Sequence, residues 1–139
     1  MTRFVLDASV SLRWFLDQPV PAYASRVKQL MFDGSLAVVP ALWHLEMANG
    51  LVVAQRRGLL TPSDADQSVA YVEQLLAQSI ESDAALVSIR QALLTARKFQ
   101  LSSYDAAYLE TAQRGNLPLA TLDQPLRAAA KRAGVEIVM

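Results

Sequence analysis

The sequence contains no cysteine and only one histidine. Without cysteine there can be no disulfide bonds and no thiolate metal sites, so we expect a reducing, cytoplasmic location. Long apolar segments are missing too, and the opening stretch MTRFVLDASV already carries an acid at its seventh position. This pattern is typical of neither a signal peptide nor a membrane span.

An excess of charge of one sign is also absent. Thirteen basic and thirteen acidic side chains give a formal net charge of zero, so any binding of nucleic acid must depend on a local patch. Apolar residues, by contrast, are abundant: hydrophobic residues make up 53% of the chain and charged residues 19%. This composition argues against disorder, and 139 residues can bury a substantial core. We therefore expect one domain spanning residues 1–139.

Short β-rich runs alternate with longer helical patterns along the chain. We expect strands at 3–6, 36–39, 79–82, 118–121 and 135–139, and helices at 11–15, 21–34, 41–58, 61–78, 84–98, 103–114 and 124–133. This alternation, without glycine-rich linkers, predicts an α/β fold with a mainly parallel sheet and helices on both faces. In such sheets, ligands bind beyond the carboxyl ends of the strands.

Four acids belong near that edge. Asp7 directly follows the first predicted strand, and Asp123 follows the fourth by two residues. Glu46 is the only acid within residues 41–55, a helical segment that is apolar almost all round and therefore expected to be buried. Asp105 lies at the start of the helix in SSYDAAYLETA, on the face that carries its apolar residues.

Each acid taken singly also has a structural explanation. Asp7 and Asp123 could be N-caps of the helices that follow them. Ser102 and Asp105 form the capping-box pattern S-x-x-D. Capping explains least about Glu46, because a buried charge without a partner costs several kcal/mol.

Taken together, the acids favour a metal site. Two carboxylates about 5 Å apart, at an effective dielectric constant near 20, repel by roughly 3 kcal/mol, so four can share one edge only with protons or a cation. A set of oxygen donors suits Mg²⁺ or Mn²⁺ rather than zinc, and such ions serve phosphoryl transfer by activating a water molecule. The single histidine, His44, points about 200° around the helix from Glu46, so we expect it to be non-catalytic.

Four motifs, in order, resemble those of the PIN-domain ribonucleases, especially the VapC-type toxins of bacterial and archaeal toxin–antitoxin pairs. They are VLDAS (5–9), P-x-L-W-x-x-E-x-x-N (40–49), SSYDAAYLETA (102–112) and LATLD (119–123). The resemblance covers essentially the whole chain. It implies a three-layer α/β/α sandwich around a mainly parallel sheet with strand order 3-2-1-4-5.

The resemblance also implies roles for individual residues. The positions that match the acidic, metal-binding quartet are Asp7, Glu46, Asp105 and Asp123. Supporting positions are the hydroxyls of Ser9 and Thr121, which orient carboxylates or water, and Asn49 beside the site. The implied activity is cleavage of RNA with Mg²⁺ or Mn²⁺, which slows translation. The implied partners are a VapB-type antitoxin across the active-site groove and a second subunit, in a homodimer or a toxin–antitoxin hetero-oligomer.

Binding of RNA needs positive charge near the acids. The candidates are Arg13, Arg56 and Arg57, although arginines at helix ends are commonly solvated partners of the helix dipole. The aromatic residues that could stack on bases are Trp14, Trp43 and Tyr104, and in so apolar a chain we expect them to pack in the core instead.

Two other classes of function remain open. The first is a PIN-fold module that binds RNA or protein without cleavage, although such a module would be expected to have lost one of the acids. The second is an aspartate-based phosphatase or receiver domain. Such phosphatases usually carry a second acid two residues after the nucleophile, where this chain has Ser9.

Overall fold

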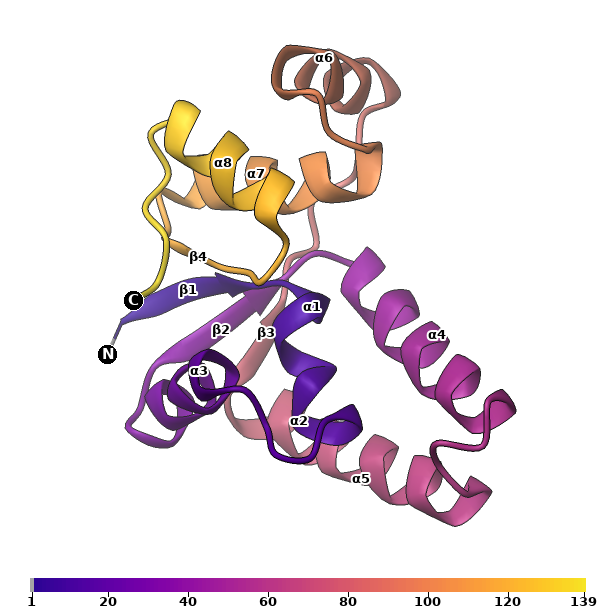
Figure 1. Cartoon of the computed structure of the whole chain (residues 1–139). Helices are drawn as coiled ribbons and strands as arrows, with labels where there is room; N and C mark the ends of the chain where they lie inside the picture. The colour runs from indigo at the N-terminus through magenta and orange to yellow at the C-terminus, as the bar shows by residue number, and fades with distance from the viewer. Residues whose placement is uncertain (1) are drawn as a thin grey trace.

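The computed structural model describes residues 2–139, which form a parallel sheet between layers of helices (Figure 1). Within these residues the sheet has four strands in the order β3-β2-β1-β4: β1 (Arg3–Leu6), β2 (Leu36–Val39), β3 (Ile80–Ser82) and β4 (Leu119–Ala120). The predicted order is therefore confirmed for these strands. The strand predicted at 135–139 is reduced to one parallel bridge, between Ile137 and Leu119.

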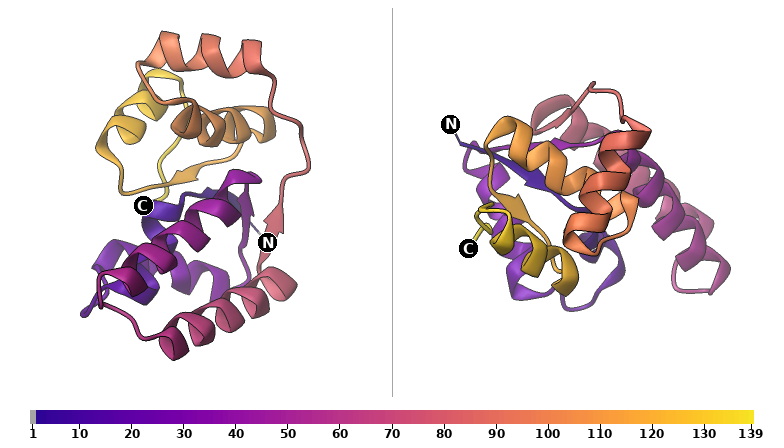
Figure 2. Two further views of the ribbon diagram at one scale, coloured as in Figure 1. Left: turned by 90° about the vertical axis from the view of Figure 1, so that its right-hand side faces the viewer. Right: turned by 90° about the horizontal axis from the view of Figure 1, so that it is seen from above.

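Helices cover both faces of the sheet. In chain order they are α1 (Ala8–Ser11), α2 (Arg13–Leu16), α3 (Ala22–Phe32), α4 (Leu42–Arg56), α5 (Pro62–Gln78), α6 (Ile89–Phe99), α7 (Ser103–Gly115) and α8 (Gln124–Arg132). Helices α7 and α8 lie on one face, α1, α2, α3 and α5 on the other, and α4 and α5 form a hairpin that extends from the sheet edge (Figures 1 and 2). Helix α6 packs outside α7, away from the sheet. Among residues 2–139, no helix combines the length and apolar character needed to cross a membrane.

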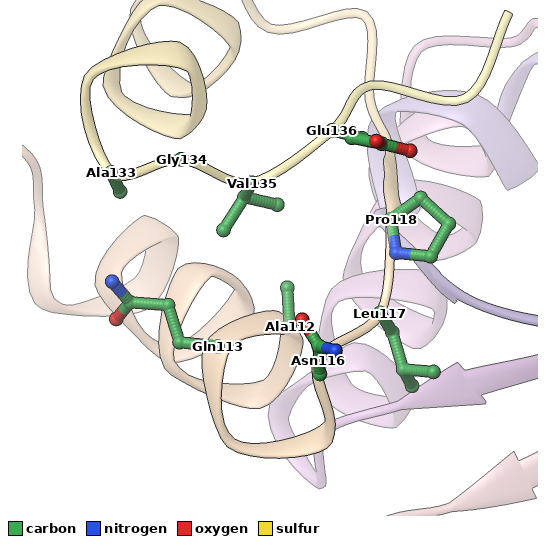
Figure 3. Close-up of a pocket in the computed structure, with 9 residues that line it drawn as sticks. All are labelled: Ala112, Gln113, Asn116, Leu117, Pro118, Ala133, Gly134, Val135 and Glu136. Atoms are coloured by element: carbon green, nitrogen blue, oxygen red, sulfur yellow. The ribbon is translucent and has the colours of Figure 1, made fainter.

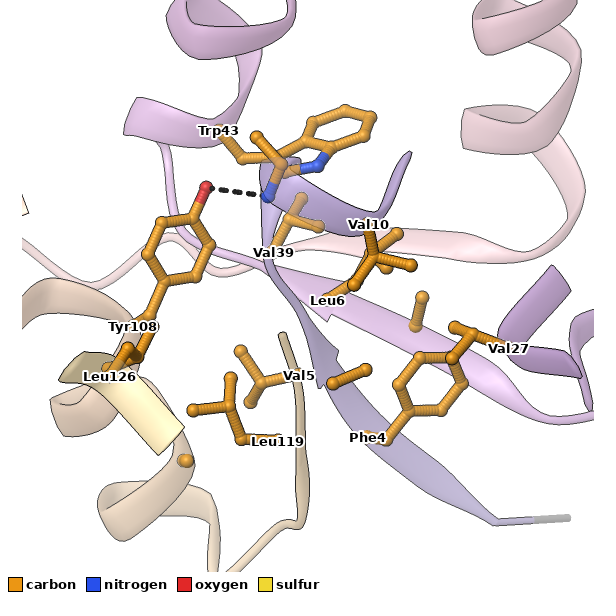
Figure 4. Packing of buried hydrophobic residues seen from close by; sticks show 14 of the residues in the cluster. Phe4, Val5, Leu6, Val10, Val27, Val39, Trp43, Tyr108, Leu119 and Leu126 are labelled. Atoms are coloured by element: carbon orange, nitrogen blue, oxygen red, sulfur yellow. Dashed lines mark hydrogen bonds between the residues drawn. The ribbon is translucent and has the colours of Figure 1, made fainter. Parts of the chain in front are cut away.

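The central strand β1 is apolar because both of its faces are covered. Phe4, Val5 and Leu6 are all buried, as expected for a strand in the middle of a parallel sheet. Figure 4 shows Val5 beside Leu119 on one side of β1, and Phe4 beside Val27 on the other. Burial on both faces holds the carboxyl end of β1, and the residue that follows it, in a fixed position.

Two predicted helices differ from the structure. The short helix expected at 11–15 is instead a pair of single turns, α1 and α2, separated at Leu12. The helix expected at 84–98 begins only at Ile89, because the Oγ of Ser88 accepts a hydrogen bond from Gln91 N (3.3 Å) and caps it there. The apolar residues just before this cap belong to an extended link, in which Leu86 is 97% exposed.

The capping box predicted at the start of α5 is present in full. The Oγ1 of Thr61 accepts from Asp64 N at 3.0 Å, and the carboxylate of Asp64 accepts from Thr61 N at 3.0 Å. These two bonds lower the pKa of Asp64. Pro62 occupies the first helical position, where a missing N–H costs nothing.

Candidate active site

The four acids singled out in the sequence line one hollow at the carboxyl edge of the sheet. Its volume is about 340 Å³. Its walls come from the β1–α1 junction, the middle of α4, and the first turns of α7 and α8. The residues that line it are Asp7, Ala8, Ser9, Leu12, Glu46, Asn49, Gly50, Asp105 and Asp123.

Asp7 is almost completely buried, at 4% exposure, and is held by hydroxyl groups. It occupies the N-cap position of α1, but its side chain makes no capping bond, so the capping explanation is wrong for this residue. Instead, its Oδ2 accepts hydrogen bonds from Ser9 Oγ and from Thr121 Oγ1, both at 2.6 Å. The Oγ1 of Thr121 also accepts from the backbone N–H of Asp123 at 3.0 Å, which ties the β4–α8 loop to the same carboxylate.

Glu46 is half-buried in the middle of α4 and receives a hydrogen bond from a tyrosine. The hydroxyl of Tyr108 donates to Glu46 Oε1 at 2.5 Å and accepts from Ala8 N at 3.4 Å. The ring of Tyr108 is fully buried, and Figure 4 shows its hydroxyl reaching the start of α1. None of the sequence motifs predicts a role for Tyr108 in the site. The available signal was a residue with a polar end three positions after Asp105, on the same helix face.

Asp105 and Asp123 stand at the starts of α7 and α8. The Oγ of Ser102 caps α7 by accepting from Asp105 N at 3.1 Å, while the Asp105 carboxylate lines the hollow. Asp123 does cap its helix, since its Oδ2 accepts from Leu126 N at 3.2 Å. Capping and a place in the hollow are thus compatible for Asp123.

Burial and mutual repulsion raise the pKa of three of these carboxyls. Burial is the main cause of the raised pKa of Asp7 and of Glu46. The charge of Asp123 raises the pKa of Asp7 further, and the charge of Asp7 raises the pKa of Glu46 further. The pKa of Asp105 is raised to about 6, and burial is again the largest cause. The smaller causes, in order, are the charges of Asp123 and Asp7, a hydrogen bond with Asp123 and the charge of Glu46. The acids therefore act on one another as a single electrostatic group.

Among the described residues, no cationic side chain forms a salt bridge with this group. A fifth acid at the same edge, Asp83, is paired with Arg114, and Arg13 is paired with Asp17 at 2.8 Å. Within residues 2–139, no salt bridge involves any of the four acids in the hollow. Their charge must therefore be balanced by protons or by a cation from solution.

The donor atoms fit a hard divalent cation. The hollow offers carboxylate oxygens and the amide of Asn49, without a thiolate or an imidazole. In the described part of the chain, no three acidic, histidine or cysteine side chains converge closely enough to ligate one ion. Mg²⁺ usually takes one or two protein carboxylates and completes its octahedral shell with water and substrate phosphates.

The arginines proposed for RNA binding lie outside the hollow. Arg13 is on α2 in its pair with an acid, and Arg56 and Arg57 lie at the end of α4. Ten residues separate Arg56 from Glu46, which corresponds to roughly 15 Å along a helix. Arg56 and Arg57 could contact only a substrate that extends well beyond the acids.

Two of the three candidate aromatic residues pack inside the protein, as expected. Trp43 is buried and donates to Ser11 Oγ at 3.1 Å, and Trp14 donates to the carbonyl of Ala24 at 2.8 Å. The expectation is wrong for Tyr104, which is 66% exposed, because its position in the first turn of α7 turns it away from the core.

His44 does not line the hollow. Its Nε2 is hydrogen-bonded to the Oγ of Ser82 at 2.6 Å, at the end of β3, and its ring meets that of Trp43 edge-on at 5.2 Å. His44 therefore makes its contacts outside the hollow, and its lack of a catalytic role stays a prediction.

A second hollow, of about 360 Å³, lies at the C-terminal ends of α7 and α8 (Figure 3). It is lined by Gln113, Asn116 and Glu136 together with small and apolar residues. It adjoins the residue before β4, and so lies at the opposite edge of the sheet from the four acids. With one carboxylate and no acid–base pair, it lacks the chemical groups that the first hollow brings together.

Comparison with solved structures gives relatives of the same fold. PAE2754 from Pyrobaculum aerophilum has 22% sequence identity and a TM-score of 0.69, over 99% of this chain and 84% of that one. FitAcB from Neisseria gonorrhoeae has 19% identity and a TM-score of 0.68, over 98% and 96% of the two chains. At such identities the likeness shows the fold alone.

A comparison with curated protein sequences gives no significant match. The family described as PIN domain, however, matches the sequence over residues 4–132. That range includes strands β2, β3 and β4, all of β1 except Arg3, and all four acids of the hollow. The chain therefore belongs to the PIN-domain family.

Proposed function

We propose that this protein is a Mg²⁺- or Mn²⁺-dependent ribonuclease that hydrolyses phosphodiester bonds in RNA. PIN domains are usually nucleases, and this chain keeps an acid at each of the four positions expected of an active member. The observation that carries the proposal is the convergence of Asp7, Glu46, Asp105 and Asp123 on one hollow, where no cationic side chain among residues 2–139 forms a salt bridge with them.

A bound divalent ion would lower the pKa of an attacking water and neutralise charge on the displaced oxygen. Asp7, Glu46 and Asp105 are the proposed direct ligands, and Asp123 would hold a second ion or act through water. Because no three of the described acids converge on one point, the side chains of these ligands would have to draw closer together around a bound ion. The hydroxyls of Ser9 and Thr121 keep Asp7 in one orientation, and the breadth of the hollow leaves room for a phosphate beside it. No histidine contributes, because His44 is bonded to Ser82 outside the hollow.

Cleavage of RNA by the purified protein tests this activity. The unaltered protein should cut RNA with Mg²⁺ or Mn²⁺ and stop when EDTA is added. Asp7→Asn should reduce the rate by at least about 100-fold, because replacing even an outer partner of a metal ligand commonly costs 10–100-fold. Asp66→Asn, which changes an exposed acid on α5, is the matched control and should cut at the normal rate.

Activity that survives EDTA, or normal activity in Asp7→Asn, would contradict the proposal. Binding of RNA without cleavage under every metal condition would favour the alternative, a non-cleaving PIN module. Turnover of a phosphomonoester in place of RNA would favour the phosphatase class.

The proposed biological role is that of a VapC-type toxin, active in the cytoplasm, which slows translation. Its proposed partners are a VapB-type antitoxin that covers the hollow and a second subunit, in a homodimer or a toxin–antitoxin hetero-oligomer. Co-expression with the short reading frame beside the gene tests this role. Relief of growth inhibition by that neighbour, and its co-purification with this chain, are the expected results.

A further inference from the structure

The hydroxyl of Tyr108 joins three segments that are far apart in the sequence. Tyr108 lies on α7, three residues after Asp105, and its hydroxyl donates to Glu46 Oε1 on α4 at 2.5 Å. The same oxygen accepts from Ala8 N, at the start of α1, at 3.4 Å. Glu46 lies 62 positions before Tyr108 in the sequence, and Ala8 lies 100 positions before it, yet both contact the same hydroxyl group.

This bond determines which oxygen of Glu46 remains available. The Tyr108 hydroxyl engages Oε1, so the other oxygen of the carboxylate is left to serve a ligand in the hollow that Glu46 lines. The side chain of Glu46 is long and flexible, and among the described residues its carboxylate has no hydrogen-bond partner other than Tyr108. Without the tyrosine hydroxyl, the carboxylate would be free to turn toward solvent.

Packing alone does not account for the hydroxyl. The ring of Tyr108 is fully buried, and a phenylalanine would fill the same space. A buried hydroxyl group needs a hydrogen-bond partner. The Tyr108 hydroxyl has an acceptor, Glu46 Oε1, and a donor, Ala8 N, and both residues line the hollow. Neighbouring Asp7 is held in the same manner, by two hydroxyls on one oxygen.

We propose that Tyr108 is a positioning residue, which orients the carboxylate of Glu46 toward a divalent cation held in the hollow. This inference rests on the proposed function, since it supposes that the hollow takes Mg²⁺ or Mn²⁺. Partners of metal ligands in the next layer commonly change metal affinity by about 10–100-fold when they are removed. Loss of the Tyr108 hydroxyl should weaken cation binding by a factor in that range.

The test is binding of Mn²⁺ to the RNA-free protein, followed by the electron paramagnetic resonance signal of the free ion. Tyr108→Phe should raise the dissociation constant by about 10-fold or more. Tyr23→Phe is the matched control, because Tyr23 is partly buried and its hydroxyl donates to the carbonyl of Val138 at 2.7 Å, away from the hollow. It should bind Mn²⁺ as the unaltered protein does.

A double-mutant cycle separates positioning from a general structural effect. Glu46→Gln should weaken binding by itself, and adding Tyr108→Phe to it should cause little further loss, because the tyrosine acts through Glu46. Equal further losses in both backgrounds would overturn the proposal. This comparison holds even if Tyr108→Phe lowers the melting temperature, since a general loss of stability would affect both backgrounds alike.

The two proposals fail in different ways. Mn²⁺ binding that is equal in the unaltered protein and in Tyr108→Phe would overturn the role of Tyr108 and leave the proposed ribonuclease intact. Failure of the unaltered protein and of Tyr23→Phe to bind Mn²⁺ at all would overturn both.

Discussion

Asp7 accepts both of its side-chain hydrogen bonds on a single oxygen, Oδ2, from Ser9 and Thr121. Glu46 is bonded through Oε1 only. In these two acids, side-chain bonds from the described residues orient one oxygen and leave the other as an acceptor. A carboxylate held in this way loses less rotational freedom when it binds an ion, so the site is organised in advance.

Thr121→Val tests how much the bond to Asp7 contributes to stability. The Thr121 hydroxyl is fully buried between the Asp7 carboxylate and Asp123 N, so its removal leaves both without this partner. We expect a loss of about 1–3 kcal/mol in the free energy of unfolding, measured with urea. Thr111→Val is the control: this threonine is also buried, but it donates to the carbonyl of Ala107 within its own helix, so the loss should be distinctly smaller. Equal losses would contradict the expectation.

Asp105 should make the metal-free protein less stable as pH rises. Its pKa in the folded protein is about 6, above the ordinary value of 3.8. A raised pKa means that the folded state holds the proton more tightly, so this stabilisation is complete below pH 3.8 and is lost as pH rises through about 6. Asp105→Asn lacks this charge at every pH.

In EDTA, Asp105→Asn should therefore melt a few degrees above the unaltered protein at pH 7, and the gain should vanish at pH 4. Asp7 and Glu46 titrate in both proteins, so the difference between the two melting curves isolates the effect of Asp105. A difference that is the same at both pH values would show that Asp105 does not share the charge of the group.

At this scale the sequence was informative about the acids and silent about Tyr108. The acids could be found because each stands at a strand end, at a helix start or alone in an apolar helix. The partners of the Tyr108 hydroxyl lie 62 and 100 residues away. Within α7, the sequence pattern indicates only that Tyr108 is a large residue on the face of the helix that packs against the core.

At the scale of elements, prediction was reliable where a pattern and a cap agreed. The start of α5 was found because Thr61, Pro62 and Asp64 give a local signal that does not depend on the rest of the fold. The start of α6 was missed because Leu86 and Val87 are apolar yet exposed, so they extend the helical pattern backwards without being part of a helix. The strand at 135–139 was overestimated, since apolar composition alone does not show how many ladder bonds an edge segment can make.

Gly50 allows α4 to approach the α1–α2 turn beside the acids. A Cβ atom at this position would lie 2.5 Å from a Leu12 methyl group, so Gly50→Ala must displace Leu12, which also lines the hollow. Alanine favours the helix by about 1 kcal/mol, whereas overpacking costs about 1–3 kcal/mol. We expect net destabilisation of up to about 2 kcal/mol, measured by urea unfolding.

The sign of this effect should reverse when the clash is removed. A Leu12→Ala background removes the three atoms nearest to the added Cβ, so the helix preference of alanine should dominate there and Gly50→Ala should stabilise the protein. Destabilisation in both backgrounds would show that Gly50 serves something other than the contact with Leu12.

At the scale of the whole molecule, the parallel sheet brings the acids together. Because all four described strands run in one direction, the segments that follow β1 and β4 meet at one edge, and α4 starts from the same edge after β2. The sequence predicted this meeting from the positions of the acids after the strands of a mainly parallel sheet, without knowledge of any side-chain contact. That residues 1–139 form one domain stays a prediction, and Met1 lies outside the described residues.

Divalent cations should stabilise the fold as a whole, because a ligand that binds only the folded state adds to its free energy of unfolding. An ion at 100 times its dissociation constant contributes about 2.7 kcal/mol, which should raise the melting temperature by several degrees and be reversed by EDTA. Asp66→Asn should keep this gain.

Asp7→Asn should show whether Asp7 mainly repels the other acids or mainly supports the fold. Relief of repulsion would make the metal-free protein more stable, whereas structural damage would make it less stable. The substitution removes one charge from a crowded group and keeps an oxygen that can accept from Ser9 and Thr121, so the metal-free variant should be at least as stable as the unaltered protein. The same variant should gain little from Mg²⁺ or Mn²⁺, because it lacks a proposed ligand. Thermal unfolding with and without the ions measures both quantities in one experiment. A variant that is less stable without metal, yet gains as much from it, would show that Asp7 supports the fold and does not hold the ion.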